Sequence, residues 1–172
     1  MGRALQFFPL VDKGMPKRTR KAHRRKRRLR GGATWEGLTF PNTSLSITFG
    51  DQKVNGARLS RELTESLPDI KIQPISGAAF CTLICFDPDA VAKSWIHLLY
   101  ANSESCNLLT RKVAFEWTPP SPPSGEHRYI FALFIHEYPI TEFPKQRGYF
   151  DIAAFANENG LKPHSAVSMT SV

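Results

Sequence analysis

Three short stretches of this chain combine carboxylate, imidazole and aromatic side chains, and each adjoins an apolar segment. They are Asp87-Pro88-Asp89-Ala90, Trp95-Ile96-His97 and residues 122–129, which read Pro-Pro-Ser-Gly-Glu-His-Arg-Tyr. Imidazole N–H groups can donate to the oxygens of an anion, and a neighbouring carboxylate can hold an imidazole in place and favour its protonated form. Polar groups at the ends of apolar segments are typical of a small ligand pocket.

An enzymatic role would need an activated nucleophile beside these groups. Ser124 is the only aliphatic hydroxyl inside the third stretch, and no local feature activates it. The spacing of Cys81, Cys85 and Cys106 fits neither a zinc site nor a redox pair. We therefore expect a protein that is not an enzyme and has no cofactor and no metal. We interpret the three cysteines as reduced and mostly buried, which suits a cytoplasmic or nuclear location.

Positive charge is concentrated at the N-terminus. Residues 1–32 hold 12 of the 23 Lys and Arg but one of the 15 Asp and Glu, so their charge is about +11 against about −3 for residues 33–172. Such a segment cannot bury apolar surface, and we expect a disordered basic arm that binds nucleic acid or another anionic surface. The candidate polyanion-binding residues are Arg24, Arg25, Lys26, Arg27 and Arg28.

The rest of the chain has mainly β patterns. Residues 45–49 alternate apolar and polar side chains, as a half-buried strand does. Residues 81–86, 95–101 and 129–135 are apolar runs that predict neighbouring strands buried on both faces. No apolar run approaches the ~18 residues that a membrane span needs, so we expect no transmembrane segment.

Two short helices are also predicted. Leu59, Leu63 and Leu67 recur every four residues and stop before a proline. Asp151 can cap a helix that ends at Gly160. The chain therefore divides into the arm, residues 1–32, and one domain, residues 33–172. The fold class expected for this domain is mainly β, an antiparallel Greek-key-like β-sandwich with a few short helices.

The order of these motifs resembles the phosphatidylethanolamine-binding protein family. That family carries Asp-Pro-Asp-Ala-Pro, Trp-x-His, Gly-Pro-x-Pro-Pro-x-Gly-x-His-Arg-Tyr and Arg-x-x-Phe, and the last motif corresponds here to Arg147-Gly148-Tyr149-Phe150. Val91 replaces the second proline of the first motif, and Pro119 replaces the glycine of the third. The resemblance implies a β-sandwich whose pocket accepts phosphate-like groups, including phospholipid headgroups. Carried over by motif, the pocket residues are Asp87, Trp95, His97, Pro123, His127 and Tyr129.

Two functions are compatible with these observations. The first is a binding or regulatory protein, with a phosphate-bearing small molecule or phospholipid headgroup in the pocket, a role that can extend to a regulated protein partner. The alternative is a nucleic-acid-associated structural component of a ribosome or virion, in which the arm binds and the domain is only a scaffold. If His97 and His127 donate to an anion, its affinity should be greater near pH 6 than near pH 8. Arg128 is interpreted as an ion-pair partner that holds a loop.

Overall fold

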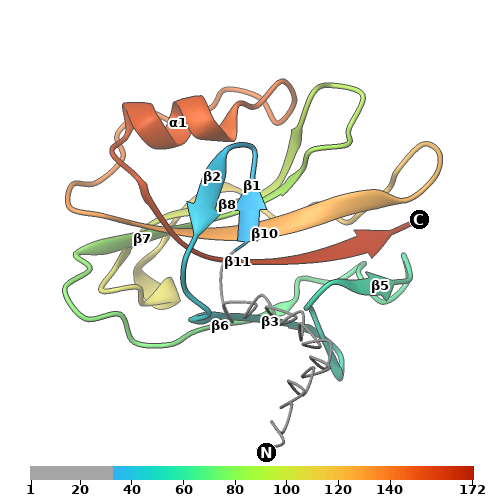
Figure 1. Cartoon of the computed structure of the whole chain (residues 1–172), viewed down its shortest axis with the longest axis horizontal. Helices are drawn as coiled ribbons and strands as arrows, with labels where there is room; N and C mark the ends of the chain where they lie inside the picture. Colours follow the sequence, from blue (N-terminus) through green and yellow to red (C-terminus); the bar gives the residue numbers. More distant parts are fainter. Residues whose placement is uncertain (1–32) are drawn as a thin grey trace, which may run out of the picture.

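The computed structural model describes residues 33–172. The predicted arm, with the candidate polyanion-binding residues Arg24, Arg25, Lys26, Arg27 and Arg28, lies outside the described residues. Most regular structure is β, as predicted (Figure 1). The elements are β1 (Ala33–Trp35), β2 (Leu38–Phe40), β3 (Leu45–Phe49), β4 (Gln52–Lys53), β5 (Ala57–Leu59), β6 (Asp69–Ile72), β7 (Phe80–Asp87), β8 (Trp95–Glu104), the 3₁₀ turn η1 (Leu108–Thr110), β9 (Lys112–Phe115), β10 (His127–His136), α1 (Ile152–Glu158) and β11 (Lys162–Ser171).

A six-stranded sheet forms the centre of the domain, in the order β5-β11-β10-β7-β8-β9. Its neighbours are antiparallel except for the parallel pair β5 and β11. A smaller sheet, β4-β3-β6, covers one face, while α1 lies across the other face beside the β1-β2 hairpin (Figure 1). The predicted mainly β, sandwich-like fold is therefore confirmed.

Strict alternation along β10 explains why the central sheet is buried on both faces. Tyr129, Phe131 and Leu133 pack toward the small sheet, whereas Ile130 and Phe134 pack toward α1. Successive side chains of a strand point to opposite faces, so a continuous apolar run is what a doubly covered strand requires. The predicted neighbouring strands over 81–86, 95–101 and 129–135 are confirmed as parts of β7, β8 and β10.

One predicted helix is present and the other is wrong. Asp151 caps α1, its Oδ1 accepting a hydrogen bond from the Ala154 amide at 2.8 Å, and Gly160 follows with φ of +62°. Between residues 59 and 67 there is no helix: β5 ends at Leu59 and turns follow. Pairing of β5 with β11 places Leu59 in a strand, and Leu67, beyond the turns that follow, is exposed.

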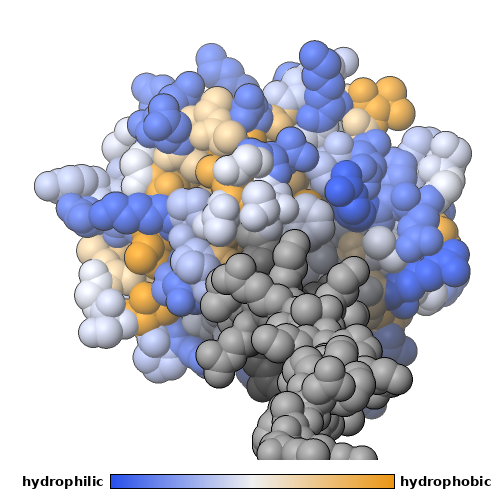
Figure 2. All heavy atoms as spheres, in the orientation of Figure 1, coloured by the Kyte–Doolittle hydropathy of each residue, from blue (hydrophilic) through white to orange (hydrophobic). Residues whose placement is uncertain are grey.

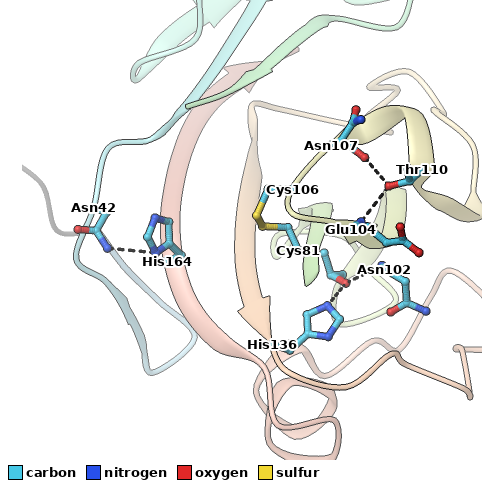
Figure 3. The surroundings of a disulfide bond; sticks show 10 residues. Asn42, Cys81, Asn102, Glu104, Cys106, Asn107, Thr110, His136 and His164 are labelled. Atoms are coloured by element: carbon cyan, nitrogen blue, oxygen red, sulfur yellow. Dashed lines mark hydrogen bonds between the residues drawn. A yellow bond between two sulfur atoms is a disulfide. The ribbon is translucent and has the colours of Figure 1, made fainter. Parts of the chain in front are cut away.

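The interpretation of all three cysteines as reduced is also wrong. Cys81 and Cys106 form a disulfide, with their Cα atoms 4.8 Å apart (Figure 3). Cys81 pairs across the sheet with Ser103, and the turn after β8 brings Cys106 back onto it. Cys85 is free and buried, and burial raises the pKa of its thiol. The expected cytoplasmic or nuclear location loses the support that it drew from reduced cysteines.

The surface is mixed in character. On the face seen in Figure 2, hydrophilic side chains predominate and hydrophobic areas between them are small. Across residues 33–172, none of the helices has both the length and the apolar character needed to span a bilayer.

Candidate anion-binding site

Strand direction brings the three motifs together. Because β7 runs antiparallel to both of its neighbours, its last residues lie beside the first residues of β8 and β10. Asp87 accordingly pairs with Trp95, and Phe86 pairs with Ile130. A cavity of about 270 Å³ opens at this end of the sheet. Its lining includes all six predicted pocket residues: Asp87, Trp95, His97, Pro123, His127 and Tyr129.

Asp87 and His127 form a buried pair at the base of this cavity. Nδ1 of His127 lies 2.7 Å from Oδ2 of Asp87, and the other carboxylate oxygen accepts the Asp89 amide at 2.8 Å. Because an ionised carboxylate only accepts, Nδ1 of His127 carries the proton. Nε2 is then the ring nitrogen that remains for a ligand. The predicted role of Asp87, holding one imidazole in place, agrees with this geometry.

A second ion pair, between Arg128 and Asp89, joins the start of β10 to the loop after β7. Arg128 donates from Nε and Nη2 to the two oxygens of Asp89 at 2.8 and 2.6 Å, and its backbone amide adds a third bond at 2.9 Å. The hydrogen bond from the Arg128 side chain lowers the pKa of Asp89. Arg128 therefore holds the loop after β7 against the start of β10, which is the role that we inferred for it.

His97 sits at a bulge in β8. The register moves from Cys85 opposite Leu98 to Phe86 opposite Ile96, so His97 has no partner of its own on β7. Bulges re-aim side chains and are common beside functional sites. Here the bulge lets His97 contact the ring of Trp117 while the next residue, Leu98, packs on the same side of the sheet. The sequence pattern contained no signal for this irregularity.

The hydrogen bonding of His97 involves the backbone. Its Nδ1 lies 2.6 Å from the carbonyl oxygen of Thr118, and the Thr118 amide donates back to the His97 carbonyl at 2.9 Å. A carbonyl can only accept, so Nδ1 carries the proton, and Nε2 makes no hydrogen bond to residues 33–172. Burial lowers the pKa of His97, which favours the neutral ring. Donation from His97 to an anion therefore stays a prediction, and it requires the protonated ring.

Among the described residues that line the cavity, Tyr129 contributes the one fully buried side-chain hydroxyl without a hydrogen-bond partner. The residue is fully buried, its ring meets His97 edge-on at 5.0 Å, and Oη has no partner among the described residues. Burial raises the pKa of Tyr129, so the hydroxyl remains a donor throughout the physiological range. Buried polar groups without partners are uncommon and call for a specific explanation, such as a missing ligand or water.

Two supporting residues come from the fourth motif, to which no role had been assigned. Arg147 donates to the carbonyl oxygens of Ile96, His97 and Glu116 at 2.9, 3.2 and 2.9 Å, and so ties β8 to the segment before the proline-rich loop. Gly148 lies against the Trp95 ring, where a Cβ would come within 3.4 Å of Cε3. The motif itself was the only signal for these positions.

The two departures from the family motifs lie at the edge of the site. Val91 is 88% exposed and belongs to the rim of the cavity. Pro119 lies outside the lining, in an adjacent hollow that also contains Arg61 and Glu65. Within residues 33–172, His, Cys, Asp and Glu side chains form no group suited to holding a metal ion.

An antiparallel sandwich with an imidazole and carboxylate cavity at the end of its central sheet defines a class of binding domain. Residues 42–169 match the family described as phosphatidylethanolamine-binding protein, and the chain belongs to this family.

Curated relatives include the protein BROTHER of FT and TFL 1 of Arabidopsis thaliana. It is 30% identical over 141 residues, which cover 74% of this chain and 78% of the relative. The protein SELF-PRUNING of Solanum lycopersicum is 28% identical, with coverage of 74% and 79%.

Solved structures show the same fold at lower identity. The carboxypeptidase Y inhibitor, solved in complex with its cognate proteinase, superposes with a TM-score of 0.65 at 19% identity, covering 75% of this chain and 83% of the inhibitor. The phosphatidylethanolamine-binding protein of Plasmodium vivax gives a TM-score of 0.62 at 18% identity, with coverage of 74% and 83%.

Proposed function

We propose that this protein is a non-enzymatic binding and regulatory protein whose cavity takes a phosphate-bearing ligand, free or as part of a phospholipid. The observation that carries the proposal is the Tyr129 hydroxyl, buried without a partner among the described residues in a cavity of about 270 Å³ that His97 and His127 also line. A buried donor without a partner costs roughly 1–3 kcal/mol, and a ligand oxygen would remove that cost.

The surroundings of the cavity support binding rather than catalysis. Ser124 is exposed and lies outside the cavity lining, and within residues 33–172 no hydrogen bond links it to His97 or His127. Family membership supports a phosphate-bearing ligand, since relatives are described as binding phosphatidylethanolamine. The relative solved with its cognate proteinase supports regulation of a protein partner as part of the same proposal.

Removing the Tyr129 hydroxyl tests this function directly. Tyr129→Phe deletes a buried hydroxyl that has no partner among residues 33–172. The free energy of unfolding should therefore stay the same or rise by up to about 1 kcal/mol. Affinity for methyl phosphate, measured by isothermal titration calorimetry on the full chain, should fall about fivefold to tenfold. Tyr100→Phe is the matched control, because Tyr100 is equally buried but bonds Glu116 at 3.5 Å away from the cavity. Unchanged methyl phosphate affinity in Tyr129→Phe would contradict the proposal.

We further propose that residues 1–32 are a separate basic arm that binds polyanions, joined to a domain over residues 33–172. Phosphate contacts release counterions, so affinity for duplex DNA should fall steeply with salt. If eight of the 12 bases engage, the slope of log affinity against log salt is about −7, from about −0.9 per contact. Phosphate contacts carry no base information, so sequence preference should be slight.

Fluorescence anisotropy on the full chain tests the arm. Replacing Arg24, Arg25, Lys26, Arg27 and Arg28 by Gln should reduce the slope by about four units, whereas replacing the exposed Lys53 and Lys145 should leave it nearly unchanged. Equal slopes in the arm variant and the unmodified protein would show that the arm is not the polyanion site. Strong arm binding without any anion in the cavity would favour the alternative, a nucleic-acid-associated component whose domain is a scaffold.

A further inference from the structure

We propose that a hollow beside α1 is a docking surface for the basic part of the chain's own arm, residues 17–30, and that duplex DNA competes with this hollow for the arm. This inference rests on the polyanion-binding arm proposed above and specifies its regulation. The hollow has a volume of about 570 Å³ and lies between α1 and residues 141–151. None of its lining residues lines the anion cavity, so the two features are separate.

One face of α1 forms a wall of the hollow. Four residues of the helix and its cap line it: Asp151, Ala154, Phe155 and Glu158. Positions three, four and seven residues apart share one face of a helix, which explains this set. Phe155 is buried against the ring of Phe150, with centroids 5.5 Å apart, and so fixes the helix to the core. Ala154 and Glu158 are exposed and remain accessible to a docking segment.

The lining of the hollow is acidic. It contains the carboxylates of Glu142, Asp151 and Glu158 but one amine, that of Lys145. None of the three carboxylates makes an ion pair within residues 33–172. Residues 17–30 contain 10 Lys and Arg and no Asp or Glu, so their charge is complementary to that of the hollow.

Tyr149 adds an exposed aromatic ring to the same lining. The residue is 70% exposed, and its amide donates to the Ala92 carbonyl at 2.7 Å, which holds the backbone of the loop in place. Lys112 already lies over the ring of Phe143, whereas no cation of the described part of the chain lies over Tyr149. An arginine guanidinium stacks favourably on such a ring. The hollow therefore suits a segment that is rich in arginine.

The arm joins the domain within reach of this hollow. Glu36 lies three residues after Ala33, the first residue of β1, which is about 10 Å along an extended strand. Glu36 and Asp151 line a smaller hollow together, and Asp151 also lines the large one. The β1-β2 hairpin and α1 lie on the same face of the central sheet (Figure 1). About ten residues before Ala33 can span roughly 30 Å, so residues 17–30 can enter the hollow.

Docking would regulate the binding of DNA. One arm cannot lie in the hollow and on a duplex at the same time, so the apparent affinity for DNA is reduced by the fraction of protein whose arm is free. Three carboxylates offer far less negative charge than a run of phosphates. A duplex should therefore displace the hollow, while weaker or smaller polyanions should be discriminated against.

Removing carboxylates from the hollow tests the competition. The double variant Glu142→Gln with Glu158→Gln, studied as the full chain by fluorescence anisotropy in about 50 mM salt, should bind duplex DNA roughly threefold to tenfold more tightly. Glu62→Gln with Glu65→Gln is the matched control. These two glutamates are also exposed and without ion pairs among residues 33–172, but they line a different hollow. Long-range electrostatics would raise the affinity of both double variants alike, so the difference between them measures docking.

Amide NMR on the full chain detects the docked arm directly. The signals of Tyr149, Ala154 and Glu158 should shift in the arm variant, in which residues 24–28 are Gln, and should move in the same direction when duplex DNA is added to the unmodified protein. The amide of Glu62 should stay unchanged by the arm variant. The shifts should not depend on protein concentration, because the contact lies within one chain. Thermal melting confirms that each variant is folded.

Each outcome decides a different claim. Tighter DNA binding in the Glu142 and Glu158 variant than in its control, together with the shifts at α1, supports the inference. Equal DNA affinities of the two double variants, or signals at α1 that ignore both DNA and the arm variant, would overturn docking and leave the arm as the polyanion site. Shifts that grow with protein concentration would assign the hollow to the arm of a second copy and overturn the contact within one chain. DNA binding that is unchanged in the arm variant would overturn the proposed function of the arm itself.

Discussion

Nδ1 of His97 donates to the carbonyl oxygen of Thr118 at 2.6 Å, and this contact determines the hydrogen-bonding role of the ring in the cavity. A histidine beside an anion site is usually regarded as a donor, because it titrates near neutral pH. Here the backbone takes the available proton of the neutral ring, and burial lowers the pKa of His97. In its neutral form the ring therefore presents Nε2 as an acceptor.

Stability should decrease as the pH falls. Burial lowers the pKa of His97, His136 and His164, so the native protein keeps them neutral where the unfolded chain, with a pKa of about 6.5, takes up protons. Because the unfolded state then binds more protons, the free energy of unfolding declines between about pH 7.5 and 5.5, by at most about 1.4 kcal/mol per pH unit for each histidine. Urea unfolding at the two pH values measures this.

The variant His136→Gln tests how much one histidine contributes to the pH dependence of the free energy of unfolding. His136 bonds Thr82 through Nε2 at 2.9 Å and the Tyr138 carbonyl through Nδ1 at 2.7 Å. His136→Gln removes a group whose pKa is lower in the folded protein than in the unfolded chain, so the stability of the variant should depend less on pH. Greater stability at the lower pH in the unmodified protein would contradict the assignment of neutral buried histidines.

Arg147 should affect both the fold and the cavity. Arg147→Met loses the guanidinium that lies over the Phe115 ring and donates to three carbonyls, and should cost about 2 kcal/mol of stability. It should also lower methyl phosphate affinity several-fold, because His97 is held less firmly. Arg111→Met is the control: Arg111 also donates to a carbonyl, that of Leu108 at 2.7 Å, and lies over the Tyr100 ring away from the cavity. Equal loss of affinity in both variants would argue against a positioning role for Arg147.

Gly148 should be needed to keep the Trp95 ring in its place in the cavity lining. A Cβ at this position would come within 3.1 Å of the Ala92 Cβ and 3.4 Å of the Trp95 ring. Gly148→Ala should therefore cost about 1–3 kcal/mol of stability, and it should weaken methyl phosphate binding because the Trp95 ring shifts. The double variant Gly148→Ala with Ala92→Gly removes the tightest contact and should recover part of both losses. Losses that simply add in the double variant would refute the steric explanation.

The disulfide should be measurable as a thiol count and as a stability difference. Titration with a thiol reagent in denaturant without reductant should find one thiol, that of Cys85, and reductant should reveal the other two. Cross-linking residues separated by 25 positions stabilises by roughly 3–4 kcal/mol on a chain-entropy estimate, so reductant should lower the unfolding midpoint. Three reactive thiols without reductant would contradict the Cys81–Cys106 bond.

The sequence was sufficient to predict three neighbouring strands of the central sheet, β7, β8 and β10. Apolar runs of strand length on β7, β8 and β10 can be buried only by covering both faces, and antiparallel neighbours necessarily bring the end of β7 to the starts of the other two. The helix cap at Asp151 was also predictable from the sequence. The capping side chain bonds an amide only three residues ahead, so its signature is short.

Features that depend on distant contacts were missed. The leucine spacing at 59–67 resembled a helix, but pairing of β5 with β11, more than 100 residues away, determined the conformation. Cys81 and Cys106 meet only because of a turn after β8. The bulge at His97 and its bond to Thr118 arise from how three segments fit together, and residue types alone carry no signal for either.

The central claim is that the cavity at the end of β7, β8 and β10 binds a phosphate-type anion through its histidine rings. Two-dimensional NMR of the histidine ¹⁵N nuclei, recorded on the full chain with and without methyl phosphate, tests it most directly. We expect His97 of the protein without ligand to be the neutral Nδ1–H tautomer, and methyl phosphate to shift Nε2 of His97 and His127 but not His136, which lies outside the cavity. An Nε2–H tautomer for His97, or shifts confined to residues outside the cavity, would contradict it.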